Sequence, residues 1–272
     1  MLRKSCVRSV VALLAIVCTV IASRSAQAAG AAEMPPAPKV STFAPADDLA
    51  RQADQYLKAL GASVASEEEY KDDQETIAKD ANTLIVIALA LGLHDQESRY
   101  KAQAGDVMKA AQAVAVTKDY ASAKKAIAAL QAAAQGKGQT ETALKWEKVA
   151  SLPELMKQVP LVNTKLKRYV KPEKFKKKAR DAAGLAAVIA AIAQGSMPNA
   201  SDTKKPAEVK KWYGFMAAMR DHAGAVGAAI RQRDEPAAAK AMKDLQQSCE
   251  DCHAVFHPEA NEKAKAASAP RT

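Results

Sequence analysis

Residues 181–194 read DAAGLAAVIAAIAQ, a stretch of small and aliphatic residues without a proline. Its large apolar side chains recur at helical spacing, at Leu185, Val188, Ile189 and Ile192. Positions i, i+3, i+4 and i+7 lie on one face of an α-helix, so the spacing predicts a helix with one buried stripe. Elsewhere in the chain no stretch alternates with the period of two that a half-buried strand shows. The fold is therefore expected to be all-α.

The same pattern continues on both sides of this stretch. Alanine and lysine are abundant and both favour helices, whereas the chain has 11 glycines in 272 residues. Two helix starts are marked by a polar residue shortly before Pro206 and Pro236, and Pro258 is expected to end the last helix. The pattern predicts two sets of four helices: 46–61, 67–91, 99–116 and 118–134, then 140–168, 172–194, 206–231 and 235–257.

The two sets resemble each other in sequence. Residues 118–138 align without gaps with residues 233–253, and six positions are identical. Asp80-Ala81 matches Asp181-Ala182 in a further pair of helices, although alanine-rich helices also align by chance. We interpret the pattern as two tandem four-helix bundles, 46–138 and 139–260, each long enough to bury the apolar stripes of its helices.

The N-terminus has the three parts of a secretory signal peptide. A basic start is followed by an apolar run over 10–22 and by the small-x-small sequence Ala26-Gln27-Ala28. The apolar run is shorter than a membrane span needs, so a retained anchor is the less favoured alternative. We expect residues 1–28 to be removed after Ala28, which makes the protein exported and periplasmic, without a stable membrane span.

The two ends of the mature chain are expected to lie outside the bundles. Residues 29–45 are rich in alanine and proline without a period, which predicts a flexible leader. Residues 261–272 are expected to be a disordered tail.

Cleavage also changes the charge of the protein. Lys plus Arg falls from 40 to 36 while Asp plus Glu stays at 30, so the formal charge becomes +6. A mildly basic surface favours docking to an acidic redox partner or an anionic surface. Aromatic residues make up 4% of the chain and the lysines are scattered along helices, so no nucleic acid is expected as a partner. We interpret the densest run, 174–178, as a solvated helix face.

The cysteines gather in one motif. Cys6 and Cys18 leave with the signal peptide, which leaves Cys249 and Cys252, followed by His253. Cys-x-x-Cys-His is the attachment signature of a covalent haem. Positions i and i+3 share a helix face, so both thiols can form thioethers to one haem while the adjacent histidine binds the iron.

Two other uses of the motif are weaker. A zinc site needs four ligands, and the chain offers three further histidines, His94, His222 and His257. A redox-active dithiol usually lies in a βαβ setting, and no strand is expected here. The motif therefore predicts one haem c per chain.

The sequence Cys249-x-x-Cys252-His253-x-x-Phe256, at the end of an all-helical unit, resembles class II c-type cytochromes, the family of cytochrome c′ and cytochrome c556. The resemblance implies that Phe256 contacts the haem. The resemblance covers about 145–260, and more faintly 46–138 as a copy without haem. In that copy the alignment puts Ala134, Lys137 and Gly138 at the positions of the two cysteines and the histidine. The family usually has Arg or Lys after the aromatic residue, and this chain has His257 instead.

The resemblance implies that the sixth iron ligand, if there is one, comes from the first helix of the haem-binding bundle. Low-spin members use a methionine there, and cytochrome c′ leaves the iron five-coordinate. Met156 stands in this helix and aligns with Leu57 of the first set, while Leu152-Pro153 replaces the Arg-Gln pair of the family. A methionine on an apolar helix face is often a packing residue. His222 is a second candidate.

Two functions follow from the resemblance, and Met156 separates them. If Met156 binds the iron, the protein is an electron carrier that exchanges electrons with redox partner proteins in the exported compartment. If it does not, the protein resembles cytochrome c′ and binds NO or CO as a sensor or scavenger. The haemless bundle is expected to serve as a docking or accessory module. The chain contains no hydrolase triad or phosphate loop, so we do not expect an enzyme.

The oligomeric state also follows from the resemblance alone. Class II relatives often dimerise through their first helices. A homodimer is one expectation for this chain, and pairing of the two bundles within one chain is the other.

Overall fold

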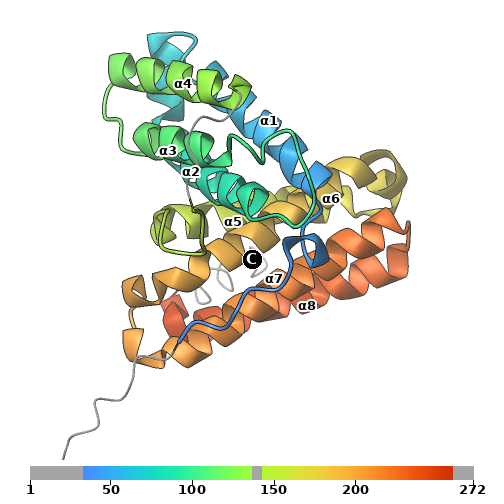
Figure 1. The fold of residues 1–272 in the computed structure, drawn as a ribbon. Coiled ribbons are helices and arrows are strands. Elements are labelled where there is room, and N and C mark those ends of the chain that lie inside the picture. The colour runs from blue at the N-terminus through green and yellow to red at the C-terminus, as the bar shows by residue number, and fades with distance from the viewer. Residues whose placement is uncertain (1–32, 137–142, 260–272) are drawn as a thin grey trace, which may run out of the picture. The chain divides into compact units, whose positions relative to one another are not determined.

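The computed structural model describes residues 33–136 and 143–259. They form eight α-helices and three short 3₁₀ helices, the latter at Val40–Thr42, Met197–Asp202 and Pro206–Glu208 (Figure 1). No strand occurs in these two ranges, which confirms the all-α prediction. The α-helices are α1 (Ala46–Ala62), α2 (Glu67–Gly92), α3 (Ala104–Ala115), α4 (Tyr120–Gln135), α5 (Leu152–Tyr169), α6 (Pro172–Ser196), α7 (Val209–Arg231) and α8 (Glu235–Phe256).

Most helix boundaries lie within a few residues of the predicted ones, and α5 is the main exception. It begins at Leu152 rather than at residue 140, and residues 143–151 are not helical. Pro153 stands in the first turn of α5, where proline is favoured because its nitrogen needs no partner. The segment before it is held by side chains instead, since Asn199 donates a hydrogen bond to the carbonyl of Ala150 (3.0 Å).

Neighbours in sequence pack on one another within each set of four helices. In the first set α1 packs on α2, α2 on α3 and α3 on α4, and α4 returns to α1. In the second set α5 packs on α6, α6 on α7 and α7 on α8. Among the described helices, α5 and α8 are not a closely packed pair. The sets are joined because α2 packs on both α5 and α6, and α1 packs on α6.

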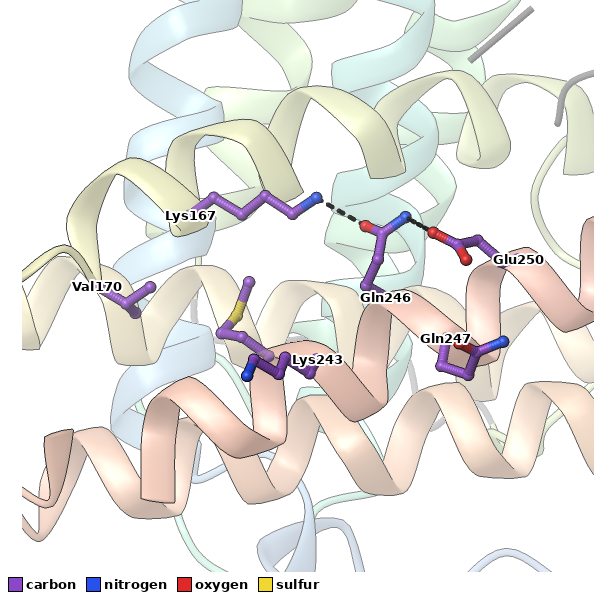
Figure 2. A pocket seen from close by; sticks show the side chains of 7 residues that line it. Lys167, Val170, Lys243, Gln246, Gln247 and Glu250 are labelled. Carbon is purple, nitrogen blue, oxygen red and sulfur yellow. Dashed lines mark hydrogen bonds between the residues drawn. The ribbon is translucent and has the colours of Figure 1, made fainter. Parts of the chain in front are cut away.

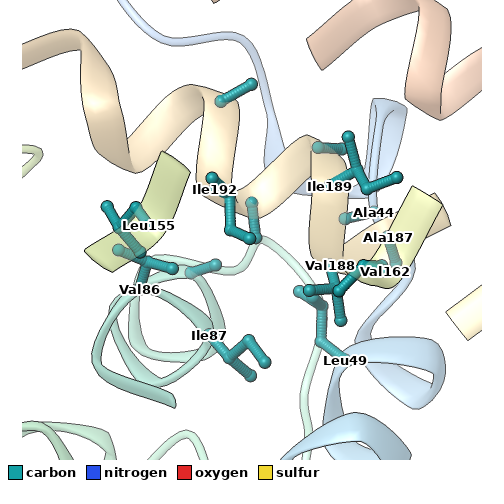
Figure 3. Packing of buried hydrophobic residues seen from close by; sticks show 14 of the residues in the cluster. Ala44, Leu49, Val86, Ile87, Leu155, Val162, Ala187, Val188, Ile189 and Ile192 are labelled. Atoms are coloured by element: carbon teal, nitrogen blue, oxygen red, sulfur yellow. The ribbon is translucent and has the colours of Figure 1, made fainter. Parts of the chain in front are cut away.

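The buried surface of α6 is wider than the single stripe that the sequence predicted. All residues from Ala182 to Ser196 are buried, and α2 is buried in the same way from Asp80 to Leu91. The reason is tertiary, because α6 packs on α1, α2, α5 and α7 and so has no face left for water. Val188, Ile189 and Ile192 of α6 lie among side chains of several elements in Figure 3.

Part of the predicted flexible leader is packed into the core. Residues 33–45 are described, and Val40, Phe43 and Ala44 are buried. Phe43 lies against Gly224 of α7, where a Cβ would come within 3.0 Å of the Phe43 backbone. Its ring also lies under the guanidinium of Arg220, 5.6 Å from the ring centroid. Three of the five residues 40–44 are buried and apolar, and hydrogen bonds from Ser41 to Asp95 and from His94 to the carbonyl of Ala44 also hold this segment.

Other predictions fall on residues that the structure does not describe. These are the signal peptide 1–28, the tail 261–272 and the boundary between 138 and 139. Within the described ranges, no helix has both the length and the apolar composition that crossing a membrane requires.

Candidate haem-attachment site

The motif lies in the last two turns of α8. The helix begins at an N-cap, where the Asp234 carboxylate accepts the N–H of Ala237 (2.9 Å), and it ends at Phe256. Both cysteines are free thiols. Cys252 is buried, whereas Cys249 and His253 are each half-buried. The motif thus stands at the edge of the core.

The surroundings of the motif shift the pKa values of Cys249, Cys252 and His253. Burial raises the pKa of the Cys252 thiol to about 12, and the neighbouring Cys249 adds to the rise. Burial also raises the pKa of Cys249. The pKa of His253 is lowered, first by burial and then by the charge of His257, whose ring centroid lies 6.0 Å away. This shift favours the neutral form of His253, the form in which histidine binds a metal.

An aromatic cluster fixes the end of α8. Phe256 packs edge-on against Trp212 at 5.4 Å and against Phe215 at 6.2 Å between ring centroids. The indole N–H of Trp212 donates to the carbonyls of Ser196 (3.2 Å) and Met197 (3.1 Å). Phe256, predicted to contact haem, is buried in this cluster one turn after His253, together with Met216 and Met219 of the core.

The directions of the helices follow from their connections. Short turns join α5 to α6 and α7 to α8, and both of these pairs pack closely. The hydrogen bonds of Trp212 place the start of α7 beside the end of α6. The four helices therefore alternate in direction, and α5 and α8 run antiparallel.

The register between α5 and α8 comes from two hydrogen bonds. Lys167 and Asn163 of α5 both donate to the side-chain oxygen of Gln246 of α8, at 2.7 and 3.4 Å; the Lys167 bond is drawn in Figure 2. Met156 stands seven residues before Asn163, and His253 stands seven residues after Gln246. Seven residues are two helical turns, about 10 Å along the axis. For straight antiparallel helices these two shifts point the same way, so this register predicts that Met156 of α5 and His253 of α8 lie at about the same level.

A cavity of about 350 Å³ opens between the same two helices. Figure 2 shows Gln246 between Lys167 and Glu250 at this cavity, with a hydrogen bond to each. Its lining residues are Lys167, Val170, Met242, Lys243, Gln246, Gln247 and Glu250. Met242, Gln246, Cys249 and His253 follow one another at helical spacing, so they share one face of α8.

The chemistry of the motif fits a covalent haem. Two free thiols stand at i and i+3 on α8 with a histidine beside them, and the open cavity lies next to them along the helix, lined by none of the three. Cys249, Cys252 and His253 would hold the group, and Met156 is the side chain of α5 that the register predicts near their level.

The other histidines lie elsewhere. The pKa of Asp244 is lowered mainly by its hydrogen bond from Lys240 and less by the charge of His222, which places His222 near Asp244. Asp244 is nine residues from His253, about 13 Å along α8, so the structure separates His222 from the motif. His94 is buried in the first set, where Nε2 donates to the carbonyl of Ala44 (2.9 Å) and Nδ1 accepts the N–H of Gln96 (2.9 Å).

Gln246 and Lys167 also belong to the surroundings of the motif, and neither was a predicted site residue. The helical spacing of Gln246, Cys249 and His253 was visible in the sequence and puts Gln246 on the face of the motif. The pairing of Gln246 with Lys167 was not visible, because 79 residues separate the two.

Neither a preformed metal cluster among the described residues nor a similar known protein identifies this site. Among the side chains that the structure places, no group of three or more His, Cys, Asp or Glu is arranged to hold a metal ion. No protein-family model, curated protein or solved structure matches the chain. The resemblance to class II cytochromes therefore rests on the motif and its place in the chain.

Proposed function

We propose that this protein is an exported c-type cytochrome that carries one haem and acts as an electron carrier. Cys249 and Cys252 form the thioethers, His253 is the proximal ligand and Met156 is the distal ligand. When bound, haem supplies a one-electron couple between ferric and ferrous iron. The signal-like N-terminus is the reason to place the protein in the periplasm.

The observation that supports the proposal is the spacing of Cys249, Cys252 and His253 on α8, and the register of α5 against α8 favours Met156 as the distal ligand. A histidine and a methionine on opposite sides of the iron favour electron transfer over gas binding, because a diatomic ligand must first displace the methionine. Cys252, Trp212 and Phe256 are buried at this end of the second set, beside the half-buried Cys249 and His253.

An absorption spectrum tests the proposal most directly. The protein is produced with haem-attachment machinery and recorded oxidised, reduced, and reduced with CO. We expect a low-spin spectrum that changes little with CO, and haem that stays on the chain after denaturation. In the control, Cys249→Ala with Cys252→Ala, denaturation should release any haem. A high-spin spectrum that shifts at once with CO would support the cytochrome c′-like gas binder instead, and an absence of covalent haem would refute both.

A basic surface supports an acidic protein as redox partner. Of the seventeen residues 165–181, nine are Lys or Arg and two are acidic, which gives +7 against +6 for the whole predicted mature chain. Within the described ranges, Lys178 is the one cation of this segment in an ion pair, with Asp181. Repulsion among these lysines and arginines disfavours the folded chain. A role in binding an acidic partner would explain why the chain nevertheless has so many of them in this segment. The segment adjoins the cavity, since Lys167 lines it.

Charge reversal on this surface should slow electron exchange with anions. For Lys165→Glu, Lys171→Glu and Lys177→Glu combined, we expect oxidation by ferricyanide to be about tenfold slower at low ionic strength, with the difference lost at about 300 mM salt. The matched control reverses three exposed lysines of the first set, Lys58, Lys124 and Lys125. Stopped-flow absorbance gives the rates. Equal slowing in both variants would show that net charge matters and that this surface does not.

A further inference from the structure

The segment that carries Met156 is partly separated from the rest of its helix. Pro160 stands inside α5 and has no N–H, so the carbonyl of Met156 lacks the hydrogen bond that an ordinary residue would donate to it. The residues from Leu152 to Val159 are thus joined to the remainder of α5 by a weakened ladder of hydrogen bonds. Something other than the helix itself must hold this first part of α5 in place.

Side chains of the first four helices supply that hold. The backbone N–H of Ser151, at the start of α5, donates to the side-chain oxygen of Asn82 of α2 (2.7 Å). Two residues earlier, Gln112 of α3 donates to the carbonyl of Val149 (2.9 Å). These two bonds fix the entry of the chain into α5.

A third contact holds the other end of the segment. The side-chain amide nitrogen of Gln158 donates to the Tyr56 hydroxyl (3.0 Å) and to a carboxylate oxygen of Asp80 (3.1 Å). All three side chains are less than a tenth exposed, so these bonds compete with little water. Removing one partner of such a buried group leaves the others unsatisfied, which makes the bonds costly to break.

Gln158 and Met156 point in different directions from α5. Two residues along a helix correspond to a rotation of about 200°, so Met156 leaves α5 on a different side from Gln158, which meets α1 and α2. The contacts of Gln158 therefore hold this segment on a side away from Met156. The position of the segment in turn sets where Met156 lies relative to His253.

From these contacts we infer that the haemless set of helices positions the distal ligand, with Asn82 and Gln158 as its positioning contacts. The inference rests on the proposed function for the role of Met156. Helices α1–α3 would thus have a role in positioning Met156, and this role requires no cofactor bound to them. The first set acts through α5, and within the described ranges none of its helices packs closely on α8.

The test measures how often Met156 leaves the iron. In the ferrous protein at saturating CO, the rate of CO binding is limited by dissociation of the methionine. We expect that rate to rise about tenfold in Asn82→Ala and in Gln158→Met, and less in Tyr56→Phe. The matched control for Tyr56→Phe is Tyr70→Phe, since the buried Tyr70 hydroxyl has no hydrogen-bond partner among the described residues. For Asn82→Ala the control is Gln103→Ala, which removes a bond to Ala134 within the first set.

Hydrogen exchange of the full-length protein supplies a readout that does not depend on methionine ligation. Amides of 152–159 should exchange faster in Asn82→Ala and Gln158→Met, while those of 161–169 stay as in the unsubstituted protein. A high-spin spectrum in the unsubstituted protein would refute Met156 as ligand, yet the exchange result would still decide whether the first set holds the segment. Faster exchange along all of α5, or equal CO rates in Tyr56→Phe and Tyr70→Phe, would overturn the inference.

Discussion

Met156→Ala is expected to turn a low-spin protein that resists CO into a high-spin protein that binds CO directly. Alanine has no ligand atom, and α5 contains no other methionine and no histidine. The CO association rate should rise at least about a hundredfold, because binding no longer waits for a ligand to dissociate. Flash photolysis or stopped-flow mixing with CO gives the rate, and the absorption spectrum gives the spin state.

The control for this substitution comes from the first set. Leu57 aligns with Met156, lies on α1 and is likewise partly buried against the core. Leu57→Ala removes a side chain of similar size but should leave the spectrum and the CO rate unchanged. If Met156→Ala remains low-spin and inert to CO, another residue binds the iron and the proposed ligand pair is wrong.

Asp80→Asn is expected to stabilise the protein at pH 7, contrary to the usual effect of changing a buried polar residue. Burial is the main cause that raises the pKa of Asp80 to about 6, from 3.8. The ionised carboxylate therefore disfavours the folded state, by about 3 kcal/mol for a shift of about two pKa units. An asparagine keeps an acceptor for Gln158, and its amide can donate to the side-chain oxygen of Gln158, which has no partner in the structure.

The pH dependence of the same pair has a definite sign. Between pH 3.8 and about 6, folded Asp80 holds a proton that the unfolded chain has lost, so stability falls as pH rises through this window. The advantage of Asp80→Asn should shrink by about 2 kcal/mol between pH 7 and pH 4.5. Urea unfolding at both values measures it. Asp181→Asn, at the aligned and half-exposed position of α6, should change stability by less than about 0.5 kcal/mol at either pH. Equal destabilisation by Asp80→Asn at both pH values would contradict the argument.

The local sequence predicted the helices well because their signals are local. The N-caps at Asp119 and Asp234 each accept a backbone N–H three residues on, at 2.9 Å, and such capping depends on a few neighbouring residues. The start of α5 was misplaced because residues 143–151 are held by contacts from distant helices, such as the bond from Gln112 to Val149. The leader was misjudged for the same reason, since the partner of Phe43 is a glycine on α7.

The sequence by itself determined the all-α class and a motif whose spacing places two thiols and a histidine together on one helix, because both properties depend on residues within a few turns of each other. Tertiary structure alone decided that α2 and α6 are buried on every side and that Gln158 meets Tyr56 and Asp80. Those facts depend on the register between helices that are far apart in the chain. Register is set by the packing of whole faces and by contacts such as that of Lys167 with Gln246, and no local pattern of residues encodes it.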